Sequence, residues 1–94
     1  MADLAYDWGL IQQYFPADVQ KLFYSIMMRE SGGESGAIAN TAYPDRPGYR
    51  SPPAGASPEY SVGLFQINVL AHTSVTADQM ANPSENVRYA ASIY

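Results

Sequence analysis

Apolar side chains recur at helical spacing at the start of the chain. The repeat has steps of three or four residues: Leu4, Trp8, Ile11 and Phe15. This period predicts an amphipathic helix over residues 3–14, within an N-terminal helical segment 1–15. The helix should end before Pro16, because proline disfavours helical backbone in the residue that precedes it.

A second apolar stripe predicts a helix over residues 17–31. Its members again lie three or four residues apart: Val19, Leu22, Phe23, Ile26 and Met27. Pro16 suits the first turn of this helix, where its missing N–H costs nothing. Gly32 and Gly33 should end it, since glycine readily adopts the left-handed conformation that is common after a helix.

The next segment, residues 40–62, changes in character. Five of the seven prolines fall here, with Tyr43, Tyr49 and Tyr60 between them. The pattern predicts an ordered loop or a short hairpin, with a stiff linker or disordered insert as the alternative. The tyrosines favour a folded surface, because their rings can stack on a ligand or pack inward with the hydroxyl still in water.

Residues 63–94 are expected to be helical. Thr76 with Gln79 predicts a capped helical turn, and Asn82-Pro83-Ser84-Glu85 is typical of a helix start. A shared face is expected in the last helix: Val87, Ala90, Ala91 and Tyr94. Together the segments predict one mainly α domain of α+β type over residues 1–94. A short β-hairpin or irregular loop would form one wall of a cleft.

Composition and charge exclude several functions. The chain has 94 residues, no cysteine and a single histidine, His72, so disulfides and His- or Cys-based metal sites are excluded and no cofactor is expected. A net charge of −4 argues against a nucleic-acid partner. No apolar run is long enough for a membrane span, and the acidic N-terminus does not resemble a signal peptide. We therefore expect a phage-encoded protein or a domain of a larger one, with its localisation left open.

Glu30 is the most informative polar residue. It follows Phe23, Ile26 and Met27 at helical spacing, which predicts a core-facing position in the last helical turn. Burial and the negative end of the helix dipole would both favour the protonated carboxyl, the form that a general acid needs. The alternative is a structural glutamate that pairs with Arg29 or caps a loop amide.

A second group of polar residues lies within the apolar stretch "YSVGLFQIN". Ser61, Gln66 and Asn68 interrupt it, and buried amides need hydrogen-bond partners. These side chains either satisfy each other within the core or line a cleft, where they would contact the hydroxyl or acetamido groups of a sugar.

These motifs together resemble the lysozyme-like superfamily, specifically its soluble lytic transglycosylase type. Glu30-Ser31 matches the first motif, and Gly63-Leu64-Phe65-Gln66 matches the second. Asn82, Pro83, Asn86 and Val87 match a later helix start. The resemblance spans about residues 19–94, whereas the family's third motif, an Ala-Tyr-Asn-like segment, has no counterpart here.

The resemblance implies cleavage of the β-1,4 bond between N-acetylmuramic acid and N-acetylglucosamine in peptidoglycan. Glu30 would act as general acid and then as base, which gives a 1,6-anhydro product without water. The residues expected to bind the glycan strand are Ser31, Ser61, Gln66, Asn68, Tyr60 and Tyr43.

Two alternatives stay open. A hydrolytic lysozyme would need a second acid, for which Glu59 and Asp45 are candidates, with Glu34 close to the glycine turn. Alternatively, a non-catalytic glycan-binding domain would keep the fold without turnover. Membership of a larger assembly, or a homo-oligomer formed through the C-terminal helix, is also compatible with the sequence.

Overall fold

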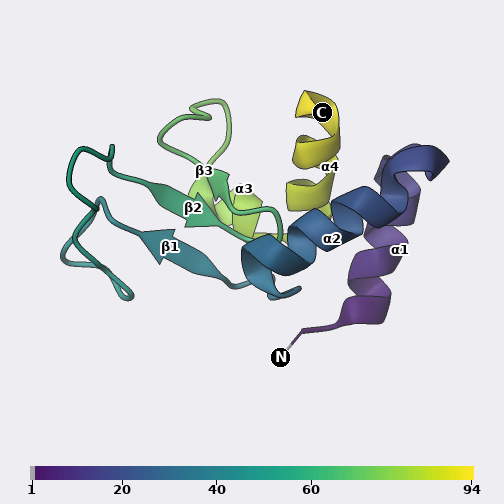
Figure 1. Cartoon of the computed structure of the whole chain (residues 1–94), viewed down its shortest axis with the longest axis horizontal. Helices are drawn as coiled ribbons and strands as arrows, with labels where there is room; N and C mark the ends of the chain where they lie inside the picture. The colour runs from purple at the N-terminus through teal and green to yellow at the C-terminus, as the bar shows by residue number, and fades with distance from the viewer. Residues whose placement is uncertain (1) are drawn as a thin grey trace.

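The computed structural model describes residues 2–94 and shows a helical body beside a small antiparallel sheet (Figure 1). The elements in chain order are α1 (Leu4–Tyr14), the 3₁₀ turn η1 (Ala17–Val19), α2 (Gln20–Ser31), β1 (Ile38–Asn40), β2 (Tyr60–Val62), β3 (Ile67–Asn68), α3 (Ala77–Ala81) and α4 (Pro83–Ile93). The predicted fold class, mainly helical α+β, is therefore confirmed.

The first two helices begin and end at the local signals in the sequence. The Asp3 side chain accepts a hydrogen bond from the amide of Tyr6 and caps α1, and Phe15 is extended ahead of Pro16. Pro16 precedes η1 rather than lying in α2 itself. Gly32 ends α2 in the left-handed conformation with φ 64°, as predicted.

The region predicted as a loop or hairpin contains both. Strand β1 pairs with β2 across the loop 41–59, and β2 pairs with β3, so that β1 and β3 are the outer strands. Asn40 holds the start of the loop. Its Oδ1 accepts from the amides of Ala42 and Tyr43, and its Nδ2 donates to the carbonyl of Tyr43.

The prediction that residues 63–94 are helical is wrong for residues 63–76. These form a turn, the short strand β3 and further turns, because Gly63 and Gln66 both take positive φ, at 85° and 49°. From Thr76 onward the prediction is correct. Thr76 and Gln79 form a capping box, and the Asn82 side chain accepts from the amide of Glu85 at the start of α4.

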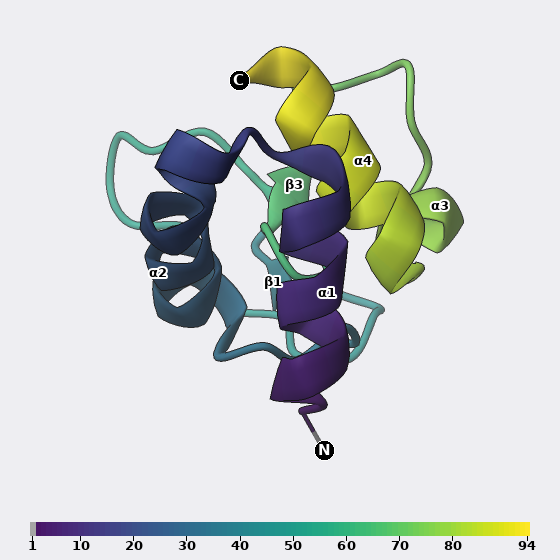
Figure 2. The same ribbon diagram turned by 90° about the vertical axis from the view of Figure 1, so that its right-hand side faces the viewer.

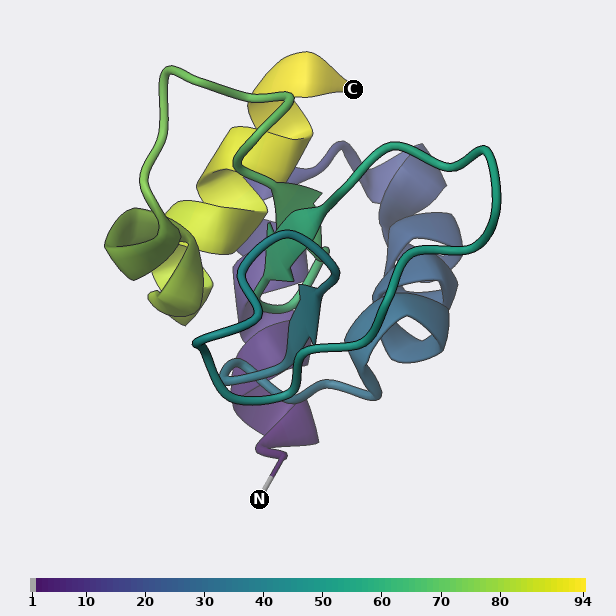
Figure 3. The ribbon, with the colours of Figure 1, turned by 90° about the vertical axis from the view of Figure 1, so that its left-hand side faces the viewer.

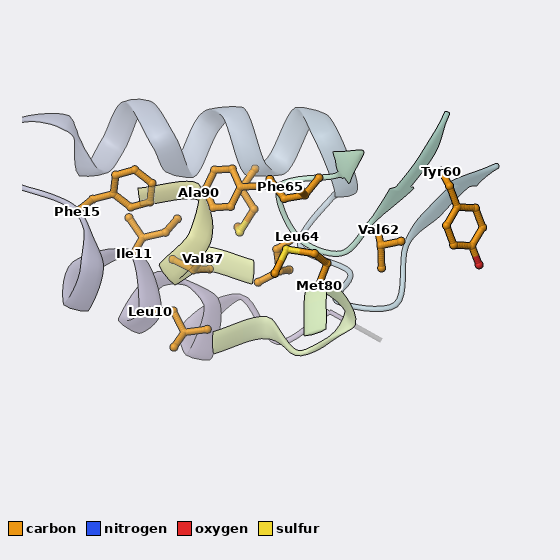
Figure 4. Close-up of a cluster of buried hydrophobic side chains, with 12 residues drawn as sticks. Leu10, Ile11, Phe15, Tyr60, Val62, Leu64, Phe65, Met80, Val87 and Ala90 are labelled. Carbon is orange, nitrogen blue, oxygen red and sulfur yellow. The ribbon is translucent and has the colours of Figure 1, made fainter. Parts of the chain in front are cut away.

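The core lies between the helices and the sheet (Figure 4). Helix α1 packs between α2 and α4, as seen from the right-hand side (Figure 2). The face predicted for α4 is buried at Val87 and Ala90, whereas Tyr94 is 65% exposed and contacts the Phe23 ring edge-on.

A single buried amide ties α4 to the sheet and to α3. Asn86 is fully buried, donates to the carbonyls of Val62 and Met80, and accepts from the amide of Phe65. Gly63 packs directly against this amide, and a Cβ there would collide with the Met80 carbonyl oxygen. The second motif is thus built around a glycine that has no room for a side chain.

Candidate active site

Glu30 lies in the last turn of α2, as predicted, but it is exposed rather than core-facing. The expectation of a buried carboxyl was therefore wrong. Met27 is the only buried residue of α2, and Leu22 of the predicted stripe is 57% exposed. In the last turn of this helix Met28 and Ser31 are half-buried, whereas Arg29 and Glu30 lie on its exposed side.

The Glu30 carboxylate is not held by the protein. Among residues 2–94 it takes part in no hydrogen bond and no ion pair, and its neighbour Arg29 does not pair with it. The structure thus differs from both structural alternatives, an ion pair with Arg29 and a cap on a loop amide. An exposed acid without a partner is available to a ligand.

Ser31 fixes the end of the helix beside Glu30. Its hydroxyl donates to the carbonyl of Met27 at 3.2 Å and accepts from the amide of Gly33 at 3.2 Å. Gly33 has φ 82° and packs against Leu4 and Asp7 of α1. The two glycines therefore end α2 and let the chain pass close to α1, which leaves the last turn in a defined place.

Gln66 joins the second motif to the segment between α2 and β1. Its Nε2 donates to the carbonyl of Ala37, in the segment between α2 and β1, and to the carbonyl of Gly63, both at 2.9 Å. The segment that follows Glu30 is thereby tied to the turn between β2 and β3. Gln66 uses only its amide nitrogen in these bonds.

Ser61 and Asn68 also bond within the protein. Ser61 is buried, and its hydroxyl donates to Glu59 Oε2 at 2.6 Å. Asn68 Oδ1 accepts from the amides of Tyr60 and Leu70, each at 3.2 Å. Like Gln66, Asn68 engages one atom of its amide in these contacts, while its nitrogen bonds no other described residue.

Tyr43, Tyr60 and Asp45 lie in the hairpin formed by β1, the loop 41–59 and β2. Tyr60 is 9% exposed and meets Tyr43 edge-on, with ring centroids 5.2 Å apart. The guanidinium of Arg46 lies 4.0 Å from the centre of the half-buried Tyr43 ring. Asp45 is exposed in the loop 41–59. The rings of Tyr43 and Tyr60 therefore pack against each other, and the Arg46 guanidinium covers the Tyr43 ring.

Two important residues were not singled out from the sequence as site candidates. Asn40 organises the loop, and Asp7 is a buried acid with 3% exposure. The pKa of Asp7 is raised to about 6, mainly by burial and in smaller part by the nearby charges of Asp3 and Glu34. Asp7 lies on the same buried face of α1 as Leu10 and Ile11, three and four residues further along the chain, so helical spacing could have indicated its burial.

The structure also bears on cofactors and membranes. No cluster of three or more His, Cys, Asp or Glu side chains suited to a metal ion occurs within residues 2–94. Over the same described part of the chain, every helix is too short or too polar to cross a bilayer.

Comparison with known families matches the lysozyme-like domain over residues 12–94. The chain belongs to the lysozyme-like domain family. No curated protein and no solved structure matches it. Membership of this family indicates peptidoglycan as the substrate and glycosidic bond cleavage as the class of reaction. The matched range includes Glu30, the hairpin and helix α4.

Proposed function

We propose that this lysozyme-like domain cleaves the β-1,4 bond between N-acetylmuramic acid and N-acetylglucosamine as a lytic transglycosylase, with Glu30 as its acid and base. The observation that carries the proposal is the exposed, unpaired Glu30 carboxylate at the end of α2. The bond from Gln66 to Ala37 supports it, because this contact ties the segment after Glu30 to the second motif.

The reaction begins with a proton transfer. Protonated Glu30 donates its proton to the bridging oxygen as the bond from that oxygen to the muramic C1 breaks, and positive charge develops on the sugar ring. The substrate's acetamido oxygen stabilises this cation. The Glu30 carboxylate then takes the proton of the muramic C6 hydroxyl, and O6 bonds to C1. The product is a 1,6-anhydro sugar, and no water is consumed.

The exposure of Glu30 makes the bound glycan part of the catalytic environment. In water the carboxylate is well solvated, so the strand itself must displace that water. Desolvation by the sugar then favours the protonated acid at the scissile bond. In this mechanism, substrate binding supplies the exclusion of water that was first expected from the protein core.

The free atoms of two amides fit glycan recognition. Gln66 Oε1 and Asn68 Nδ2 bond no other described residue and belong to partly exposed side chains. The first accepts and the second donates, which suits the N–H and carbonyl oxygen of a sugar acetamido group. Ser31 contributes by holding the last turn of α2, and Tyr43 and Tyr60 by supporting the hairpin.

One observation favours a hydrolytic alternative. Glu59 is half-buried, and Ser61 fixes one of its carboxylate oxygens, so it is an ordered second acid, unlike the exposed Asp45. A hydrolase would use such an acid to activate water or to stabilise the cation.

Digestion of purified cell wall, followed by mass spectrometry, tests the proposal. Wild-type protein should release muropeptides one water lighter than hydrolysis products, and Glu30→Gln should release none while keeping its fold. Arg29→Gln, which changes the adjacent exposed residue, is the matched control and should stay active. Hydrated reducing ends would support the hydrolase, and an unchanged rate in Glu30→Gln would exclude Glu30 as the acid. A folded wild-type protein that forms neither product would be the non-catalytic domain.

A further inference from the structure

A hollow of about 450 Å³ lies between the outer strand β1 and the loop that follows it. Its lining includes Ile38, Thr41, Gly48, Arg50 and Glu59. The loop 41–59 folds in front of the sheet in the view of Figure 3. The hollow is therefore formed by the hairpin rather than by Glu30 and the end of α2.

The hollow includes an open strand edge. Gly63 donates to Ala37, and Thr41 donates to Glu59, so these positions face β2. Hydrogen-bonded and non-hydrogen-bonded pairs alternate along an antiparallel ladder, so Ile38, opposite Val62, directs its N–H and C=O away from β2. The Ile38 side chain is also 49% exposed.

The outer edge of β1 is covered only at its C-terminal end. The amide of Arg50 donates to the carbonyl of Asn40 at 2.9 Å, which covers the strand there. The open length of the edge therefore starts at Ile38, next to Ala37, the residue that Gln66 binds. The open edge therefore directly follows the segment that connects β1 to Glu30 and the end of α2.

Two opposite charges flank this edge. Arg50 is exposed, and within residues 2–94 its guanidinium forms no ion pair. Glu59 gives Oε2 to Ser61, while its Oε1 accepts no hydrogen bond from the described residues. The hollow thus offers one cationic donor, one anionic acceptor and a strand edge with an apolar side chain. This combination suits an extended peptide better than a polyanion or a bare sugar chain.

We infer that this hollow binds the peptide stem of peptidoglycan, with an extended segment along Ile38. A stem carboxylate lies on Arg50, and a stem amine or amide N–H lies on Glu59. The stem is short and carries both carboxylates and an amine. It is joined through the lactyl group to the same muramic acid whose bond is cut, so the inference rests on the proposed function for its link to the glycan.

A binding experiment tests the hollow without any catalysis. The free tripeptide L-Ala-γ-D-Glu-meso-diaminopimelate is titrated into ¹⁵N-labelled wild-type protein. Amide shifts should concentrate at Ile38–Thr41, Arg50 and Glu59. Arg50→Gln keeps the backbone amide that bonds Asn40, and it should weaken binding roughly tenfold. Lys21→Gln removes the same charge from α2 and should bind as the wild type does. The carboxamide form of the tripeptide should bind as weakly to wild type as the acid form binds to Arg50→Gln.

An activity measurement links the hollow to cleavage. We compare kcat/KM on stem-bearing strands with kcat/KM on strands whose stems an amidase has removed. The wild-type protein should cleave the stem-bearing strands with the higher kcat/KM. In Arg50→Gln this preference should largely disappear, mainly through a change in KM, whereas Lys21→Gln should keep the wild-type preference. Cleavage without a stem preference, or shifts that lie elsewhere, would overturn the inference while leaving Glu30 as the acid. Tripeptide binding at Ile38 and Arg50 without any cleavage would uphold the hollow and reject the proposed reaction.

Discussion

Gln66 Nε2 donates to the carbonyl oxygen of Ala37 at 2.9 Å, and this contact joins the segment after α2 to the turn between β2 and β3. The two residues are 29 positions apart. The same nitrogen also donates to Gly63, so one side chain bonds both the second motif and the segment between α2 and β1. Loss of this side chain should therefore affect stability and activity together.

Gln66→Ala removes both hydrogen bonds and should lower the free energy of unfolding by about 1–2 kcal/mol. Because the segment after Glu30 loses its tie to the sheet, kcat/KM should also fall at temperatures where the variant is folded. Urea unfolding and the cell-wall digest measure the two effects. Gln13→Ala, on the exposed face of α1, is the control and should change neither. Unchanged stability of Gln66→Ala would contradict the role of this contact.

Gly63→Ala should be strongly destabilising, by more than about 3 kcal/mol. The added Cβ meets the Met80 carbonyl and the Asn86 amide, and φ at this position is 85°. Gly36→Ala offers a matched comparison, because Gly36 has open space around it and should change stability by less than about 0.5 kcal/mol. Thermal unfolding followed by circular dichroism separates the two. Similar melting temperatures for Gly63→Ala and Gly36→Ala would show that the residues around Gly63 can shift to accommodate a methyl group at little cost.

Asn86→Ala should lower the free energy of unfolding by about 2–4 kcal/mol, because it leaves two carbonyls and one amide without their buried partner. Asn82→Ala removes only the helix cap of α4 and should cost about 1 kcal/mol. Urea denaturation of both variants, at equal m-values, measures the difference. An equal loss in the two variants would mean that the buried network adds nothing beyond one capping bond.

Asp7 predicts a dependence of stability on pH. Its pKa is raised from 3.8 to about 6 in the folded protein, so between these values the folded chain holds a proton that the unfolded chain has released. Stability should therefore decrease as pH rises from about 4 to about 6, and the loss should be complete above that range. Its size is on the order of 3 kcal/mol.

Asp7→Asn should abolish this contribution and be more stable than the wild type at pH 7, as urea midpoints from pH 4 to pH 8 would show. Asp18→Asn removes an exposed acid from η1 and should retain the wild-type slope. If the wild type and Asp7→Asn show parallel profiles, Asp7 is not the group responsible.

Local signals in the sequence predicted the helix limits well. Thr76, Asn82 and Gly32 act through their own neighbouring amides and backbone angles, so their roles can be read without knowing the fold. Residues 63–76 could not be read this way. Their apolar side chains fit a helix or a buried turn equally well, and the choice depends on Gly63 packing against Asn86 of a distant helix.

The same distinction, between features set by neighbouring residues and features set by the whole fold, applies to the site residues. The placement of Glu30 in the last turn of α2 followed from helical spacing, but its exposure did not, because exposure depends on where the core ends. The pairing of Ser61 with Glu59 is nearly local, because Glu59 directly precedes β2 and lies two residues from Ser61, and a rule for i, i+2 neighbours in extended chain would have found it. The tie from Gln66 to Ala37 could not be found without the fold.

The loop 41–59 has a consequence for how such a domain can change over time. Asn40 and Thr41 hold its two ends, whereas residues 51–58 are mostly exposed and lie away from the packed core. Extending a loop whose ends are fixed costs little closure entropy. Residues 51–58 are therefore where the chain can gain or lose residues without disturbing the scaffold.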